Sequence, residues 1–424
     1  MKKKTDLAGF AELIYEENGI SRAQLAEKTH LVPSYITLLV RRLQRRGWLL
    51  EGAHTPSKGG RRRVLLHFQP ELAHVIGVQF GRLNCRIVVT DFLGKVLNFK
   101  KMASEVANGQ EHAISLVHHE IKRVLAQDPK IQGLAIAHTG VIDPTTGSVL
   151  LWPRVQGWRD VPLRKIFEDA YGLTTVVEDS SRTLALAEKR FGLGVGQKNF
   201  VCVHAGVGIG AAIFVNGQLY YGNDGVAGEL GHTTIEEGGE MCSCGNRGCL
   251  EVSASGSAII DKVRHALRQG VSSSLSSLAA RDYEGLTIET IAAAAESNDR
   301  LCQTVLAEAG NHLGTALANV VNLLNPKRII LGGATPRAAK GLLLDPLLRS
   351  LKSRAFHRAV SSLEVMVSEL GEEAPAVGAC LIATKRILRD LCTKQGAGDL
   401  LAAGKTSATF PAGEALKTST APAE

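Results

Sequence analysis

The chain has 424 residues, of which 45% are hydrophobic, so it is long enough for two or three domains with cores of their own. No apolar run approaches the ~20 residues that span a bilayer, and polar residues interrupt the lysine-headed N-terminus before a signal-peptide core can form. We therefore expect a soluble cytoplasmic protein without a membrane partner.

The net charge of +8 is concentrated at one end of the chain. Residues 1–67 contain 13 Lys or Arg against 6 Asp or Glu, whereas residues 68–424 contain 36 against 35. Such asymmetry indicates a nucleic-acid-binding module attached to a nearly neutral body. A solvated basic face is the simpler interpretation of the charge alone.

The order of elements in residues 1–68 favours the first interpretation. Apolar residues at helical spacing predict a helix over roughly residues 5–17, a capping box predicts a second helix after Ser21, and a third begins near Ser34 and ends at Gly47. Two short strands then flank the basic loop HTPSKGGRRR. This pattern predicts a winged helix-turn-helix that binds double-stranded DNA, with its third helix in the major groove and the loop as the wing.

Three groups of side chains in this domain are placed to contact DNA. The start of the third helix offers groups for bases or phosphates: Ser34, Tyr35 and Thr37. Later arginines of the same helix are phosphate contacts, unless some only face water: Arg41, Arg42, Arg45 and Arg46. The basic tip of the wing has four members: Lys58, Arg61, Arg62 and Arg63.

Residues 69–392 have the pattern of a two-lobed α/β body. HVIGVQF and CRIVVTDFLGKVL are interpreted as paired strands, and strands alternate with helices in two comparable halves, with a ligand cleft expected between them. Lobe one is placed at about 69–180 plus a C-terminal segment, and lobe two at about 181–365. The tail, residues 393–424, is rich in small and polar residues, and we expect no fixed structure there.

A compact cluster of metal-ligand residues lies in lobe two. Three of the eight cysteines fall within eight residues, preceded ten positions earlier by His232: Cys242, Cys244 and Cys249. Three thiolates and one imidazole form the ligand set of a closed tetrahedral zinc site, and Gly245 and Gly248 allow the sharp turns it needs. Three unrelated buried cysteines are the alternative, and a disulfide is disfavoured because nothing looks secreted. We predict one structural Zn²⁺.

The runs GELGH and CSCGNRGCLE, within residues 228–251, resemble the signature of the ROK family. This family contains sugar kinases and sugar-responsive transcriptional repressors on one actin-like (ribonuclease H-like) fold. The resemblance extends from about Ile20 to about Cys392. The N-terminal domain resembles that of the repressor branch, including N-acetylglucosamine- and xylose-type repressors, and ROK kinases usually lack it. The resemblance implies a homodimer that binds a DNA operator and a sugar-like effector.

Two elements of the kinase pattern are altered. ROK kinases carry Asp-x-Gly-Gly-Thr-Lys at a phosphate-binding turn, where this chain has QFGRLN from Gln79 to Asn84. The position of the general base is Ser180, whose hydroxyl cannot accept a proton near neutral pH. Asp179 is adjacent and could serve if the loop were remodelled. The turn at Gly206–Gly210 survives, but a tight turn requires glycine without any nucleotide. We expect no enzymatic activity, and an ATP-dependent sugar kinase with a DNA-binding domain is the alternative.

The resemblance also assigns residues to the effector. Family members use the counterparts of Glu229, His232 and Glu251 to hold sugar hydroxyls, and Asp179, Ser180 and Arg154 border the same cleft. His232 would bind zinc with one ring nitrogen and face the effector with the other.

Arg154 and Arg182 stand where the family often has asparagine. Pairing of these arginines with Glu178 or Asp179 at the surface is the favoured interpretation. An anionic sugar derivative, held by a bidentate arginine, is the alternative. A third hypothesis is a regulator whose effector is another polypeptide.

Overall fold

The structure is a computed structural model that describes residues 6–54, 63–153 and 155–393. Three predicted wing residues and one predicted effector residue lie outside these ranges: Lys58, Arg61, Arg62 and Arg154. The predicted tail also lies outside them, apart from its first residue. Within the described ranges, every helix is too short or too polar to cross a membrane.

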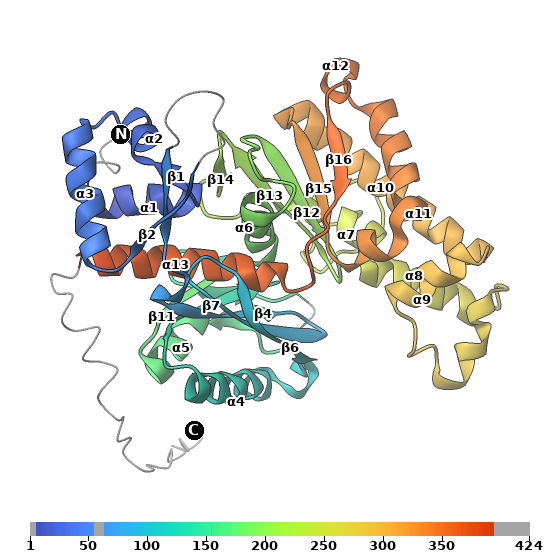
Figure 1. The fold of residues 1–424 in the computed structure, drawn as a ribbon. Coiled ribbons are helices and arrows are strands. Elements are labelled where there is room, and N and C mark those ends of the chain that lie inside the picture. Colours follow the sequence, from blue (N-terminus) through green and yellow to red (C-terminus); the bar gives the residue numbers. More distant parts are fainter. Residues whose placement is uncertain (1–5, 55–62, 154, 394–424) are drawn as a thin grey trace, which may run out of the picture.

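The N-terminal segment contains three helices and a small sheet (Figure 1). The helices are α1 (Leu7–Glu17), α2 (Arg22–Thr29) and α3 (Pro33–Arg45). The sheet has the order β1-β3-β2, with bounds Ile20–Ser21, Val64–Phe68 and Leu49–His54 respectively. Both hydrogen bonds of the predicted capping box between Ser21 and Gln24 are present. The three expected helices are therefore confirmed, although α3 ends two residues before Gly47.

The first large sheet has the order β11-β7-β4-β5-β6. Its strands, in chain order, are β4 (His74–Phe80), β5 (Asn84–Thr90), β6 (Val96–Ala103), β7 (Ile131–His138) and β11 (Thr174–Asp179). Strands β4, β7 and β11 are parallel, and β5 and β6 continue the sheet as an antiparallel meander.

The expectation of one continuous strand in CRIVVTDFLGKVL is wrong, because this run contains most of β5 and the start of β6. Asp91 ends β5 there, because its carboxylate accepts hydrogen bonds from the backbone N–H groups of Leu93 and Lys95 and so folds a turn between β5 and β6.

Helices α4 (Gln110–Gln127) and α5 (Leu163–Tyr171) cover one face of the first sheet, and α13 (Ala374–Thr393) covers the other (Figure 1). A small sheet of order β10-β9-β8 follows β7, with bounds Arg159–Val161, Ser148–Leu151 and Val141–Asp143 respectively.

The second large sheet has the order β14-β13-β12-β15-β16. Its strands are β12 (Phe200–Ala205), β13 (Ile209–Val215), β14 (Gln218–Tyr220), β15 (Arg328–Gly332) and β16 (Glu364–Val367). Helix α6 (Ser180–Phe191) packs on one face, against Phe200 and Phe214, whose rings stack at 4.5 Å. The other face is covered by helices between residues 250 and 354: α7 (Leu250–Ala254), α8 (Gly256–Arg268), α9 (Ile288–Glu296), α10 (Arg300–Leu324) and α11 (Ala334–Arg354). The short α12 (His357–Val360) precedes β16.

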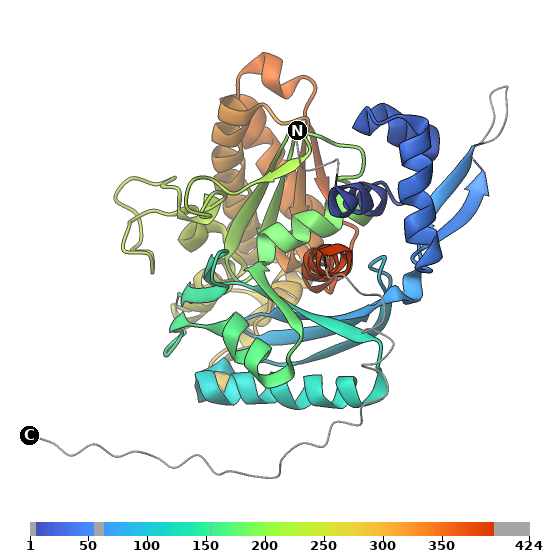
Figure 2. The ribbon, with the colours of Figure 1, turned by 90° about the vertical axis from the view of Figure 1, so that its left-hand side faces the viewer.

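Helices α6 and α13 lie between the two large sheets and touch each other closely. A Cβ atom added at Gly378 of α13 would lie 1.7 Å from the carbonyl oxygen of Thr183 of α6. Only glycine permits this backbone-to-backbone contact. Figure 2 looks along α13, drawn in red, with α6 beside it. The two helices join the sheets without an intervening layer of side chains at this point.

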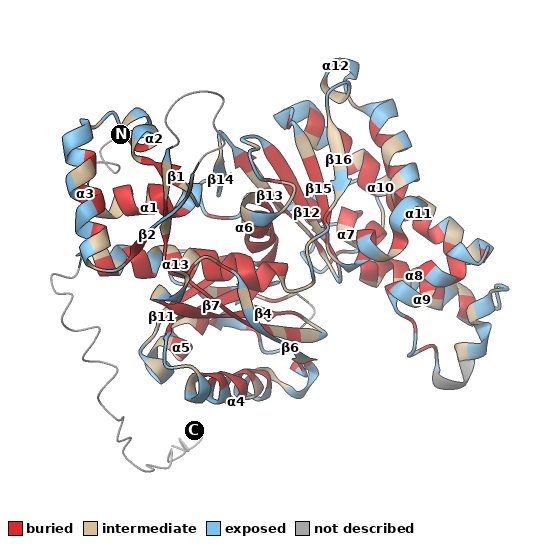
Figure 3. Cartoon of the chain, viewed as in Figure 1, coloured by how far each residue is buried: buried red, intermediate tan, exposed pale blue. Residues whose placement is uncertain are grey.

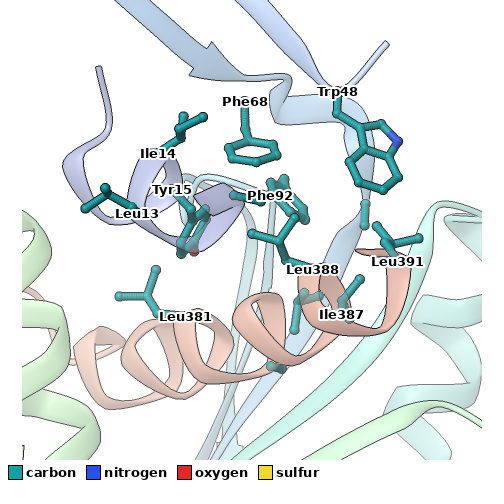
Figure 4. Close-up of a cluster of buried hydrophobic side chains, with 14 of the residues drawn as sticks. Leu13, Ile14, Tyr15, Trp48, Phe68, Phe92, Leu381, Ile387, Leu388 and Leu391 are labelled. Carbon is teal, nitrogen blue, oxygen red and sulfur yellow. The ribbon is translucent and has the colours of Figure 1, made fainter. Parts of the chain in front are cut away.

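One hydrophobic core connects the N-terminal segment to the first sheet. The rings of Tyr15 (α1) and Phe68 (β3) lie 5.6 and 5.5 Å from that of Phe92, which follows β5. Leu388 and Leu391 of α13 complete the cluster (Figure 4). Figure 3 shows the buried residues continuing from α1 through α13 into the first sheet. The N-terminal helices are therefore packed against the body and are not merely tethered to it.

Candidate functional site

Three parallel strands of the first sheet end side by side. Phe80, His138 and Asp179 occupy matching positions at the carboxyl ends of β4, β7 and β11. Ligands of open α/β sheets usually bind at this edge. The carboxylate of Asp179 accepts hydrogen bonds from the backbone N–H groups of Ser181 and Arg182, and so caps the N-terminus of α6. Ser180, the first residue of α6, is buried beside it.

A buried ion pair lies next to this cap. The Arg182 Nε atom is 3.0 Å from Glu178 Oε1, and both side chains are almost fully buried. Arg182 Nη1 donates to the carbonyl oxygen of Gly225, and its guanidinium lies 5.3 Å from the Tyr221 ring. The Tyr221 hydroxyl donates to Glu178 Oε2. The expected pairing of Arg182 is thus confirmed, but its expected position at the surface is wrong because α6 packs against the second sheet.

Carboxylates from lobe two lie close to this strand edge. Burial raises the pKa of Glu229, and the nearby carboxylates of Asp179 and Glu251 raise it further. His232 and Arg182 act in the opposite direction on the same pKa. Electrostatic coupling of this kind requires the groups to be close in space. The structure therefore brings together four residues that the family resemblance assigns to an effector, and we call this candidate site the effector site: Asp179, Glu229, His232 and Glu251.

The surviving glycine turn has a structural role. Glu251 Oε2 accepts a hydrogen bond from the backbone N–H of Ile209 at 3.0 Å. A Cβ atom at Gly208 would lie 2.5 Å from the same oxygen. The glycine therefore leaves room for the Glu251 carboxylate, and this turn does not by itself indicate a nucleotide.

The four predicted metal ligands converge on one point. Their ligand atoms all lie within 4.8 Å of one another: His232, Cys242, Cys244 and Cys249. Cys244 Sγ is 3.7 Å from Cys249 Sγ, and Cys242 Sγ is 3.5 Å from His232 Nδ1. Tetrahedral zinc with its usual bond lengths requires about 3.8 Å between two sulfurs and about 3.6 Å between a sulfur and a nitrogen.

The backbone around these ligands is arranged for the turn that the sequence predicts. Gly245 and Gly248 have positive φ angles of 93° and 67°. A Cβ atom at Gly248 would lie 1.7 Å from the carbonyl oxygen of Glu236. His232 lies in a short 3-10 helix (Leu230–His232), and Cys249 immediately precedes α7. The residues present fit one tetrahedral metal ion, held by His232 Nδ1 and three thiolates.

The first residue of the altered kinase pattern, Gln79, contacts an ion-pair network on the neighbouring strands. Arg86 Nη1 donates to the buried Gln79 side chain at 3.2 Å, and Arg86 also pairs with Glu372 at 2.8 Å. Lys101 pairs with the same carboxylate at 2.8 Å. Leu83 is 64% exposed where the family pattern has a hydroxyl. Gln79 therefore hydrogen-bonds to a neighbouring arginine from the next strand.

The outward face of α3 presents several of the predicted DNA contacts. Five of them are exposed there: Ser34, Tyr35, Arg41, Arg42 and Arg45. Thr37 is half-buried, and its hydroxyl donates to the Pro33 carbonyl oxygen. Arg46 is half-buried over the Trp48 ring, and Arg63 is exposed just before β3. Val32, the N-cap of α3, and Leu38 are also 63% and 60% exposed, and no sequence pattern predicted either as a DNA contact.

Two five-stranded sheets with the helices α6 and α13 between them form the actin-like fold that sugar kinases share. The chain belongs to the ROK family, whose model matches residues 75–386. It is 30% identical to a xylose repressor of Caldicellulosiruptor bescii over 369 residues, which cover 86% of this chain and 92% of that protein. It is 32% identical over 399 residues to the DNA-binding transcriptional dual regulator NagC of Escherichia coli, covering 92% and 94% of the two chains.

Two solved structures show the same fold. A ROK family transcriptional regulator, a homologue of the E. coli MLC protein, aligns with a TM-score of 0.74 and 28% identity, and covers 94% of this chain and 99% of its own. A ROK family glucokinase from Streptomyces griseus, in complex with glucose and AMPPNP, aligns with a TM-score of 0.66 and 28% identity, and covers 72% and 98%. The regulator therefore matches a part of this chain that the glucokinase does not.

Proposed function

We propose that this protein is a sequence-specific DNA-binding regulator, acting as a repressor, whose operator binding responds to a sugar or sugar derivative. The observation that carries the proposal is the difference in coverage between the regulator and the glucokinase, at 94% and 72% of this chain. The family match begins only at residue 75, so the three helices and small sheet before it lie outside that match. Relatives named as xylose or N-acetylglucosamine repressors match over 86–92% of this chain.

The N-terminal segment would bind DNA as a winged helix-turn-helix. Its helix α3 would lie in the major groove, because its exposed face carries Ser34, Tyr35, Arg41 and Arg42 while its opposite face is buried. Arginines contact phosphates and make binding sensitive to salt. A homodimer would place two such helices on a palindromic operator, as the family implies. Function in the cytoplasm is part of the same proposal.

The effector site would bind the hydroxyls of a sugar. Carboxylates suit adjacent hydroxyls because each oxygen accepts hydrogen bonds in fixed directions. Zinc, when bound, would hold the segment between His232 and Cys249 in one conformation. Since His232 would face the metal through Nδ1, its other nitrogen is left for the effector. The metal therefore has a structural role in this proposal, and Glu229 and Glu251 flank its ligands.

Phosphoryl transfer is disfavoured by the residues at the two altered kinase positions. The hydroxyl of Ser180 cannot act as the base, and the neighbouring Asp179 carboxylate already accepts two backbone hydrogen bonds as a helix cap. Gln79 is engaged by Arg86 at the turn where a kinase would hold phosphates. Phosphoryl transfer depends mainly on positioning, so two altered positioning elements weigh against the kinase alternative.

The experiment that tests DNA binding uses fragments selected from random DNA by the intact protein. Arg41→Ala on α3 should weaken binding and lower the slope of log affinity against log salt by about one. Arg349→Ala, an exposed arginine on α11, is the matched control and should change neither quantity. Failure of the wild-type protein to enrich any sequence, or equal effects of the two substitutions, would refute the assignment.

A further inference from the structure

Helix α6 connects the effector site to the N-terminal helices. At its first turn, Asp179 caps the helix and Arg182 pairs with Glu178. At its last turn, Arg190 Nη1 donates to the carbonyl oxygens of Tyr15 and Glu16 of α1, at 2.8 and 3.0 Å. The helix has 12 residues and is therefore about 18 Å long. A single helix thus touches both the effector site and the N-terminal segment that would bind DNA.

The contact made by Arg190 is unusual for an arginine. Its guanidinium lies 5.1 Å from the Tyr15 ring, and its Nε and Nη2 atoms are buried without a hydrogen-bond partner. Within the described part of the chain, no carboxylate forms an ion pair with it. The positive charge instead meets the carbonyl end of α1, where helix carbonyls lack partners of their own. A buried, partly unsatisfied cation is costly, which points to a role beyond stability.

Helix α1 is held from a second direction by α13. Glu16 pairs with Lys385 at 2.7 Å, and Glu12 accepts a hydrogen bond from Arg389 Nη2 at 3.0 Å. Helix α13 packs on the first sheet, whereas α6 packs on the second. The last turns of α1 therefore bridge the two lobes. Lys385 and Arg389 of α13 attach them to lobe one, and of these contacts, Arg190 is the one that attaches them to lobe two.

The close contact between α6 and α13 makes such a bridge sensitive to the angle between the lobes. Because Gly378 touches the Thr183 carbonyl directly, a rotation of one lobe on the other would pivot near that point. Arg190 lies seven residues further along α6, about 10 Å from the pivot. A rotation of about 10° would move it by about 2 Å, which is enough to break a hydrogen bond.

We propose that α6 is a lever that transmits the state of the effector site to the DNA-binding helices through the contact of Arg190 with the last turn of α1. This inference rests on the proposed function, because it describes how the effector site would regulate DNA binding. Closure of the lobes around an effector would shift Arg190 relative to α1, while the contacts of α1 with α13 would stay intact.

The test measures hydrogen exchange of amides 14–17 in the intact, zinc-loaded protein, and needs neither operator nor sugar. The perturbation is at the far end of α6. Glu178→Gln/Arg182→Met removes the buried pair without leaving an unpaired charge. Tyr221→Phe removes only the hydroxyl that binds Glu178 and serves if the first variant does not fold. Either change should speed exchange in the last turn of α1 by at least about fivefold, a modest allosteric coupling.

Two control variants test whether the effect on α1 is transmitted through Arg190. In an Arg190→Met background, the same perturbation should change exchange of amides 14–17 by less than about twofold. In an Arg389→Met background, which loosens α1 from α13 alone, the full effect should persist. Unchanged exchange in a perturbed protein that retains its zinc and its cooperative unfolding would overturn the inference, and so would an effect that survives Arg190→Met. Absence of operator or sugar binding would refute the proposed function without altering this outcome.

Discussion

Removal of one thiolate from the predicted zinc site should weaken effector binding. In Cys249→Ser the hydroxyl is a poor zinc ligand, so the protein should lose its metal. His232 and Cys249 are 17 positions apart, and a cross-link that closes a loop of this length is worth about 3 kcal/mol in chain entropy. Glu229 and Glu251 flank the two ends of that loop. If effector binding must restore their order, the affinity for the sugar should fall by up to about 100-fold.

The assay combines metal analysis with calorimetric titration of the sugar selected by a thermal-shift screen. Wild-type protein should contain close to one zinc per chain, and Cys249→Ser should contain none. Cys302→Ser is the matched control, because its thiol is buried in α10 of the same lobe and outside the metal cluster. Zinc-free wild-type protein prepared without chelator would refute the reasoning. So would a metal-free Cys249→Ser variant with unchanged sugar affinity.

Three further outcomes are expected. Glu229→Gln should weaken sugar binding by about 10- to 100-fold, the value of a hydrogen bond to a charged group, whereas the exposed Glu237→Gln should have no effect in the same titration. Ser180→Asp should yield no detectable phosphoryl transfer in a coupled ATP assay, because Gln79, hydrogen-bonded to Arg86, still stands where the kinase pattern has aspartate; turnover at about 1 s⁻¹ would contradict this. Burial lowers the pKa of His138 from 6.5 to about 3, so the folded chain keeps this ring neutral while the unfolded chain takes up a proton below about pH 6.5. Stability should therefore be complete above that pH and fall by about 1.4 kcal/mol per unit below it, which thermal unfolding from pH 7 to 5 can measure; an unchanged slope in His138→Phe would contradict the assignment.

Local patterns made the N-terminal helices and the metal cluster predictable from sequence. The capping box at Ser21 and the spacing of the three cysteines each depend on residues close together in the chain, where the physical rules are strict. The effector residues were found through a family resemblance, because Asp179 and Glu229 are far apart in sequence and meet only in the folded chain. The effect of Asp179 on the pKa of Glu229 could be seen only in the structure, because it depends on how close the two carboxylates lie.

Long-range packing could not be predicted in the same way. Nothing in the sequence around Arg190 indicates that it binds carbonyl groups about 175 residues away. The burial of Arg182 was also unpredictable, since an arginine near two carboxylates is usually paired at the surface. The division of β5 from β6 depended on Asp91, an acid within an otherwise strand-like run whose side chain folds the turn. In each case the deciding partner belongs to another element or to the backbone.

The central proposal is that binding of a sugar to this protein changes its affinity for a DNA operator. Fluorescence anisotropy with DNA selected by the intact, zinc-loaded protein tests it most directly, with xylose, N-acetylglucosamine and other sugars added in turn. We expect a dissociation constant of about 10⁻⁸ M or tighter at physiological salt, weakened at least about tenfold by one of the sugars. Operator affinity that is identical with every sugar, together with conversion of a hexose and ATP to sugar phosphate, would contradict it.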